Sequence, residues 1–112
     1  MADCLFCGVA SGEVPSRKVA EDDTLVAFED IHPGAPVHVL IIPRRHLTDI
    51  REAEDGQLLE AMFLLANKIA SDRGIEQSGY RLVFNVGPDS GQSVFHLHLH
   101  LLGGRRMGWP PG

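Results

Sequence analysis

Histidine and bulky apolar residues alternate without a break over residues 94–102, in the sequence VFHLHLHLL. Successive side chains of a β-strand point to opposite faces, so this period of two predicts a strand. On that strand His96, His98 and His100 line one face, while Phe95 and three leucines line the other. Because buried polar groups must find hydrogen-bonding partners, three imidazoles on one face indicate a functional site rather than an ordinary core strand.

Apolar runs earlier in the chain predict three further strands. They cover residues 24–29, 37–42 and 81–86, and acidic residues, Pro or Gly bound each run. The loop 87–93 that leads into the histidine segment is too short for a parallel crossover. The sheet is therefore expected to be antiparallel.

Two segments have helical character. Residues 54–73 place apolar side chains three and four positions apart, on an arc wide enough to pack on a sheet, and Gly74 is a suitable stop. Residues 4–12 suit a short helix or a turn. The order strand, strand, helix, strand, strand predicts an α+β fold.

Length and composition narrow the class of protein. The chain has 112 residues, 44% of them apolar and 22% charged, which fits one globular domain over residues 1–112. Its net charge of −5 argues against nucleic acid as a partner. The longest apolar run, 61–66, is too short to span a membrane. Cys4 and Cys7 are so close in sequence that a disulfide between them would not cross-link distant parts of the fold. A reducing, cytoplasmic location is therefore expected.

The spacing of the histidines leaves several kinds of site open. Histidines two apart on a strand can share one zinc ion, can simply face solvent, or can act as a nucleophile or acid–base group beside a phosphate. The loop 87–93, rich in Gly and small polar residues, can cradle an anion with its backbone N–H groups. The side chains of Ser90, Gln92 and Ser93 add donors. The loop favours a phosphate site with an imidazole aimed at it.

These residues resemble a known family. The segment 91–102 (GQSVFHLHLHLL) resembles the signature of the histidine triad superfamily, and 103–112 (GGRRMGWPPG) is similar to the C-terminus of its Hint branch, the nucleoside phosphoramidases. The resemblance extends over nearly the whole chain. It implies a single HIT domain with an antiparallel sheet of about five strands, one long helix and one short helix. Further matching segments are 28–31 (FEDI), 35–38 (APVH), 42–46 (IPRRH) and 79–81 (GYR).

The resemblance also implies an activity, the hydrolysis of purine nucleoside phosphoramidates to AMP or GMP and an amine. His98 would attack phosphorus and form a nucleotidyl-imidazole, and the backbone carbonyl of His96 would orient its ring. His100 would contact the phosphate, and Ser93 would complete the catalytic set. The implied nucleotide-binding residues are Phe6, Phe28, Asp30, Ile31, Asn85, Gly91, Gln92, Ser93, His98, His100 and Trp109. Val9 and Val14 match the same apolar wall, with plain core packing as an equal alternative.

Two other functions remain open at this stage. One is a non-catalytic purine-nucleotide-binding regulatory or scaffold protein that uses the same pocket. The other is a dinucleoside polyphosphate hydrolase, which the loop 91–93 and the tail 109–112 disfavour. The resemblance further implies a homodimer, in which Trp109 reaches the neighbouring subunit's active site. Trp109 covering its own protomer's core is the alternative.

The Cys-x-x-Cys near the N-terminus poses a separate question. Catalysis of the implied kind requires no cofactor, but some relatives with this arrangement carry structural zinc. Two reduced cysteines packed as small hydrophobic residues are the alternative. His32 and His38 are interpreted as structural. The candidate zinc ligands are Cys4, Cys7, His46 and His96.

Overall fold

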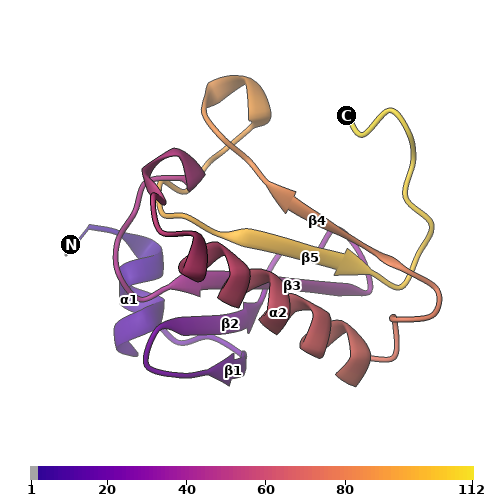
Figure 1. The fold of residues 1–112 in the computed structure, drawn as a ribbon, viewed down its shortest axis with the longest axis horizontal. Coiled ribbons are helices and arrows are strands. Elements are labelled where there is room, and N and C mark those ends of the chain that lie inside the picture. Colours follow the sequence, from indigo (N-terminus) through magenta and orange to yellow (C-terminus); the bar gives the residue numbers. More distant parts are fainter. Residues whose placement is uncertain (1–2) are drawn as a thin grey trace.

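Residues 3–112 are described by a computed structural model, in which five antiparallel strands form one sheet (Figure 1). The strand order across the sheet is β1-β2-β3-β5-β4, so the last strand of the chain lies between two earlier ones. The strands are β1 (Lys18–Glu21), β2 (Leu25–Glu29), β3 (Val37–Pro43), β4 (Tyr80–Phe84) and β5 (Leu99–Gly103). The α+β class and the antiparallel pairing are confirmed.

The long helix is α2 (Gly56–Asp72), and the short one is α1 (Leu5–Ser11). The Asp55 side chain accepts a hydrogen bond from the Gln57 N–H and caps α2, and Gly74 follows the helix at a φ of +74°. Both predicted helices are confirmed, α2 with slightly narrower bounds. Within residues 3–112, neither helix combines the length and hydrophobicity needed to cross a bilayer.

The sheet separates two apolar cores. In β2 and β3, Ala27 and Ile41 point toward α2, whereas Phe28 and Ile42 point toward α1. Both faces are covered, so residues 25–28 and 39–42 of these strands are continuously apolar instead of alternating with polar residues. In the histidine segment, Leu97 and its neighbouring leucines join the α2 core, which leaves the imidazoles on the α1 side.

One strand was not predicted, and the bounds of another are wrong. The unpredicted strand is β1, a short edge strand without a clear alternation. The histidine strand, expected over 94–102, begins only at Leu99. Its partner β3 ends at Pro43, which has no N–H for a ladder. Before Leu99 the chain runs along the segment after β3 instead, where the Leu97 N–H donates to the carbonyl of Leu47 at 2.6 Å. Phe95, which lies on the same predicted face as the buried leucines, is 59% exposed.

Candidate active site and metal centre

His98 is held in one orientation and one tautomer. Its Nδ1 lies 2.7 Å from the backbone carbonyl oxygen of His96, so Nδ1 carries the proton and donates it. The edge of the Phe6 ring packs on the imidazole, with centroids 5.1 Å apart. Burial lowers the pKa of His98 below its ordinary 6.5, which keeps the ring neutral. The unprotonated Nε2 is therefore available as a nucleophile.

His100 has the opposite tautomer, and the cause is His38. The Gly34 N–H donates to Nδ1 of His38 at 2.9 Å, so neutral His38 carries its proton on Nε2. That Nε2 lies 2.9 Å from Nδ1 of His100 and donates to it. His100 then keeps its own proton on Nε2; the Asn85 side-chain nitrogen 3.5 Å away is itself a donor, so it does not accept that proton. Burial, followed by repulsion from His98 and His38, lowers the pKa of His100 to about 4. His100 thus presents an N–H donor next to the lone pair of His98.

His38 is the site residue that the sequence analysis missed. It was interpreted as structural, yet its Nε2 also lies 3.4 Å from a carboxylate oxygen of Asp30. The signal was present in the sequence, since His38 alternates along its strand with Leu40 and Ile42 and so shares their face. The neighbours of His38 could not be predicted, because they depend on the pairing of β3 with β5.

The loop between β4 and the histidine segment is braced by Gln92. The buried side-chain amide of Gln92 accepts from the Gly87 N–H and donates to the carbonyls of Thr48 and Val94. Gly91 has a φ of +83°, which favours glycine, and Ser93 is exposed at the end of the loop. The side chain of Gln92 is therefore engaged inside the loop, and it shapes the loop around the site.

Aromatic and acidic residues lie beside the histidines on the α1 side. Phe6 and Phe28 pack edge to face with centroids 5.4 Å apart. A cavity of about 700 Å³ has Asp30, Ile31 and His38 in its lining, with Ile31 82% exposed. His38 thus links this cavity to His100. Phe6 thus packs on Phe28 of β2, and Asp30 and Ile31 directly follow that strand.

Trp109 does not cover its own protomer's core. It is 82% exposed, and the guanidinium of Arg81 stacks over its ring at 5.9 Å. Arg81 also donates to the carbonyl of Gly108 at 3.0 Å, which ties the tail to β4.

The four candidate zinc ligands, Cys4, Cys7, His46 and His96, meet at one point and are called the cysteine–histidine cluster below. Their donor atoms all lie within 4.8 Å of one another. Nδ1 of His96 lies 3.3 Å from the sulfur of Cys4 and 3.5 Å from that of Cys7, and Nδ1 of His46 lies 3.4 Å from Cys7. Around a tetrahedral zinc, sulfur and nitrogen ligands are about 3.5 Å apart.

The protonation of His96 also suits a metal ligand. Its Nε2 lies 2.9 Å from the carbonyl oxygen of Pro43 and donates to it, which leaves the lone pair of Nδ1 facing the two sulfurs. A carbonyl that accepts from the outer nitrogen is the usual support of a metal-bound histidine. The donor set, the spacing and the tautomer therefore fit zinc.

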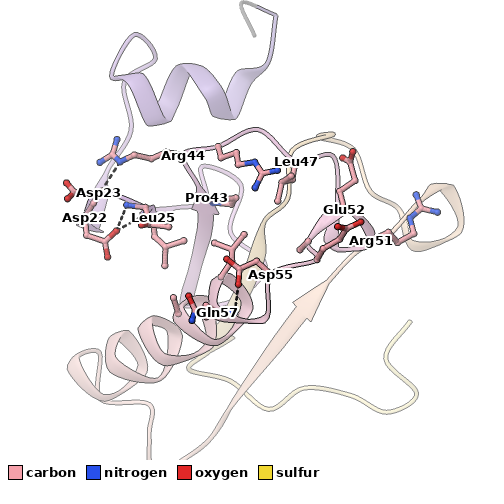
Figure 2. A pocket seen from close by; sticks show the side chains of 16 residues that line it. Asp22, Asp23, Leu25, Pro43, Arg44, Leu47, Arg51, Glu52, Asp55 and Gln57 are labelled. Atoms are coloured by element: carbon pink, nitrogen blue, oxygen red, sulfur yellow. Dashed lines mark hydrogen bonds between the residues drawn. The ribbon is translucent and has the colours of Figure 1, made fainter.

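A larger cavity, of about 1030 Å³, lies where β3 ends at Pro43, beside the start of α2 (Figure 2). Leu25 and Leu47 of the α2 core form part of its wall, and Asp55 at the start of α2 lies at its edge. Its Arg44 is paired with Glu21 at 2.9 Å. None of the three triad histidines lines this cavity.

Known proteins resemble the chain over its full length. A "HIT family hydrolase" from Legionella pneumophila superposes with a TM-score of 0.95 and is 51% identical, covering 98% of this chain and 100% of that one. An "uncharacterized HIT-like protein" of Synechocystis is 48% identical over 98% of this chain and 97% of its own. A "14 kDa zinc-binding protein" of Brassica juncea is 45% identical over 98% of this chain and 100% of its own. The sequence profile of the HIT domain matches residues 11–107, and the chain therefore belongs to the HIT, or histidine triad, family.

Proposed function

We propose that the protein hydrolyses purine nucleoside phosphoramidates to a nucleoside monophosphate and an amine. The observation that carries this proposal is the pair of opposite tautomers, with His98 offering a lone pair and His100 offering an N–H. A phosphoryl group between them would meet a nucleophile and a hydrogen-bond donor together. The HIT family hydrolase from Legionella pneumophila supports a hydrolytic reaction.

The reaction takes two displacements at phosphorus. The lone pair of His98 Nε2 forms a bond to phosphorus while the P–N bond to the amine breaks, and the leaving nitrogen takes up a proton. Water then attacks the nucleotidyl-imidazole, the bond between phosphorus and Nε2 breaks, and a proton from water is released. His98 returns to its neutral form, with Nδ1–H still bound to the carbonyl of His96. Donors around the phosphoryl oxygens stabilise the charge that develops there.

The remaining residues of the site would bind the nucleotide. Phe6, Phe28 and Ile31 would form the apolar surface on which a purine packs. The Asp30 carboxylate would face the ribose hydroxyls. His100 and Asn85 would hold phosphate oxygens. Gly91 and Gln92 contribute the loop backbone, and the exposed Ser93 hydroxyl lies toward the leaving group.

We further propose a homodimer. Strand β4 is an edge of the sheet, and an unpaired edge is a template for a second copy. Helix α2, on the adjacent face, exposes the apolar side chains of Phe63 (39%) and Leu64 (58%). Two sheets joined edge to edge would bring the exposed Trp109 of one subunit toward the site of the other.

The cysteine–histidine cluster is proposed to hold one structural zinc. The "14 kDa zinc-binding protein" of Brassica juncea supports this assignment. Four protein ligands complete a tetrahedral site, so the metal would tie the N-terminal segment to the catalytic segment and leave the chemistry to the histidines. Thiols kept free for this purpose favour the cytoplasm as location.

Parallel rate measurements on an adenosine phosphoramidate and a diadenosine polyphosphate test the proposed reaction. We expect faster turnover of the phosphoramidate, and mass spectrometry of a quenched reaction should find the nucleotidyl group on His98. Preference for the polyphosphate would support a dinucleoside polyphosphate hydrolase. Binding of AMP without turnover of either compound would support a non-catalytic nucleotide-binding protein.

A further inference from the structure

We propose that the cysteine–histidine cluster positions the nucleophile, so that metal occupancy controls how well His98 is aimed. The kinetic part of this inference rests on the proposed function, but the positioning itself does not. The cluster would then act on catalysis from outside the phosphate site, through two separate contacts to the His98 ring.

The first contact runs through His96, which uses three of its polar groups at once. Its Nδ1 faces the sulfurs of the cluster, its Nε2–H donates to Pro43, and its backbone carbonyl accepts from Nδ1 of His98 at 2.7 Å. The carbonyl that sets the tautomer of His98 thus belongs to a residue whose ring is a metal ligand.

The sheet does not provide this restraint by itself. The ladder of β5 begins at Leu99, so His96 and its carbonyl lie before the first paired residue. The hydrogen bond from the Leu97 N–H to Leu47 holds the segment on one side. On the other side the ring of His96 holds it, at 4.9 Å between centroids from the ring of His46. Anchoring of the His96 ring therefore substitutes for strand pairing.

The second contact runs through α1. Phe6 lies between Cys4 and Cys7 in sequence, and its ring edge packs on the His98 imidazole. The cap of α1 is itself made by the cluster, because the sulfur of Cys4 accepts from the N–H of Cys7. A metal bound to both sulfurs would thus fix Phe6 against His98. Two contacts orient the nucleophile: the hydrogen bond to the His96 carbonyl and the packing of Phe6. Both involve residues that the cluster holds.

Of the groups proposed for nucleotide binding, Phe6 is held by the cluster, whereas the others named here depend on other elements. Asp30 follows β2, and the phosphate loop is braced by Gln92 within itself and to Thr48. Loss of the metal should therefore lower kcat by a larger factor than it raises KM. Outer-shell partners of metal ligands change affinity or activity by about 10- to 100-fold, and a kcat loss of about tenfold or more is expected here.

The test compares zinc-loaded protein with two metal-free forms. One form is wild type stripped with a chelator, and the other is the Cys4→Ser, Cys7→Ser double variant, whose hydroxyls fit the same spaces. Long-range proton–nitrogen NMR of the imidazoles reads the tautomer of His98. We expect a single Nδ1–H form with zinc and mixed tautomers without it. Refilling wild type with cobalt(II) should restore the single form, with the visible spectrum of tetrahedral thiolate coordination.

A matched control separates positioning from general loss of stability. Ala10→Gly weakens α1 by about 1 kcal/mol and removes no ligand, so it should keep zinc, the single tautomer and kcat. An unchanged His98 tautomer in folded, metal-free protein would overturn the inference. So would unfolding of both metal-free forms, because the metal would then support the fold as a whole. Absence of phosphoramidase activity in the loaded protein would refute the proposed function, and the NMR comparison would still decide the positioning.

Discussion

Nδ1 of His98 lies 2.7 Å from the backbone carbonyl oxygen of His96, two residues earlier in the chain. This hydrogen bond helps to give the chemically identical side chains of His96 and His98 different roles. The His96 ring is buried and faces the cysteines, whereas the His98 ring presents a lone pair to the site. The predictions below follow from this division.

Replacement of His98 by Ala should abolish turnover and leave AMP binding measurable. The covalent intermediate cannot form without the nucleophile, so kcat should fall by at least about 10³-fold. Steady-state kinetics and calorimetric titration with AMP measure the two effects. His32→Ala, at an exposed position outside the site, is the control and should behave as wild type. Near-normal hydrolysis by His98→Ala would refute the assignment of the nucleophile.

Replacement of His38 by Ala should lower kcat by about tenfold and change the KM little. His38 contacts His100, and its loss frees Nδ1 of His100 to take the proton, which removes the donor from Nε2. Complete loss of one such donor typically costs about 10²- to 10³-fold in kcat, and a smaller loss is expected here because His100 without His38 can still adopt either tautomer. His38→Asn retains a polar group at the same place and should recover part of the rate. An equal rate in His38→Ala and wild type would mean that His38 is only structural.

Stability should fall on acidification through His100. Burial, with smaller contributions from His98 and His38 and an opposing one from Asp30, lowers its folded pKa from 6.5 to about 4. Between these values the unfolded chain binds more protons, so the free energy of unfolding is largest above pH 6.5 and declines toward pH 4. Thermal denaturation at pH 7 and pH 5 should show a smaller loss of Tm in His100→Gln. Equal losses in both proteins would contradict this.

Purified protein should contain close to one equivalent of zinc, and its removal should lower the Tm by more than about 10 °C. Binding energy at a structural zinc site contributes directly to folding. Elemental analysis and thermal scans with and without a chelator provide the measurements. The Cys4→Ser, Cys7→Ser double variant should not respond to the chelator. Zinc below about a tenth of an equivalent, in protein never exposed to chelators, would exclude the site.

Light scattering at micromolar concentration should report twice the chain mass of 12.2 kDa. Leu64→Glu should weaken the dimer, because it places a charge on the exposed apolar part of α2 beside the edge strand. Leu5→Glu is the matched control, since Leu5 is also half exposed (53%) but lies on α1 across the sheet. A monomeric wild type, or equal effects of the two variants, would contradict the proposed interface.

Local patterns in the sequence were enough to place most elements. The 3.6-residue period and Gly74 located α2, and the alternation over 94–102 correctly assigned leucines and imidazoles to opposite faces. Alternation describes where side chains point, and extended backbone points them alternately whether or not it is paired. The predicted faces of the leucines and imidazoles were therefore correct, whereas the predicted strand was too long.

The sequence by itself determined the family, the triad and the identity of the four possible metal ligands. Only the tertiary structure decided that Cys4 and His96, 92 residues apart, face each other, and that His38 belongs beside His100. Which strands are neighbours depends on contacts between distant segments, which no local pattern encodes. The tautomer of His100 follows from its contact with the distant His38, whereas that of His98 is set by the carbonyl of His96, two residues earlier in the chain.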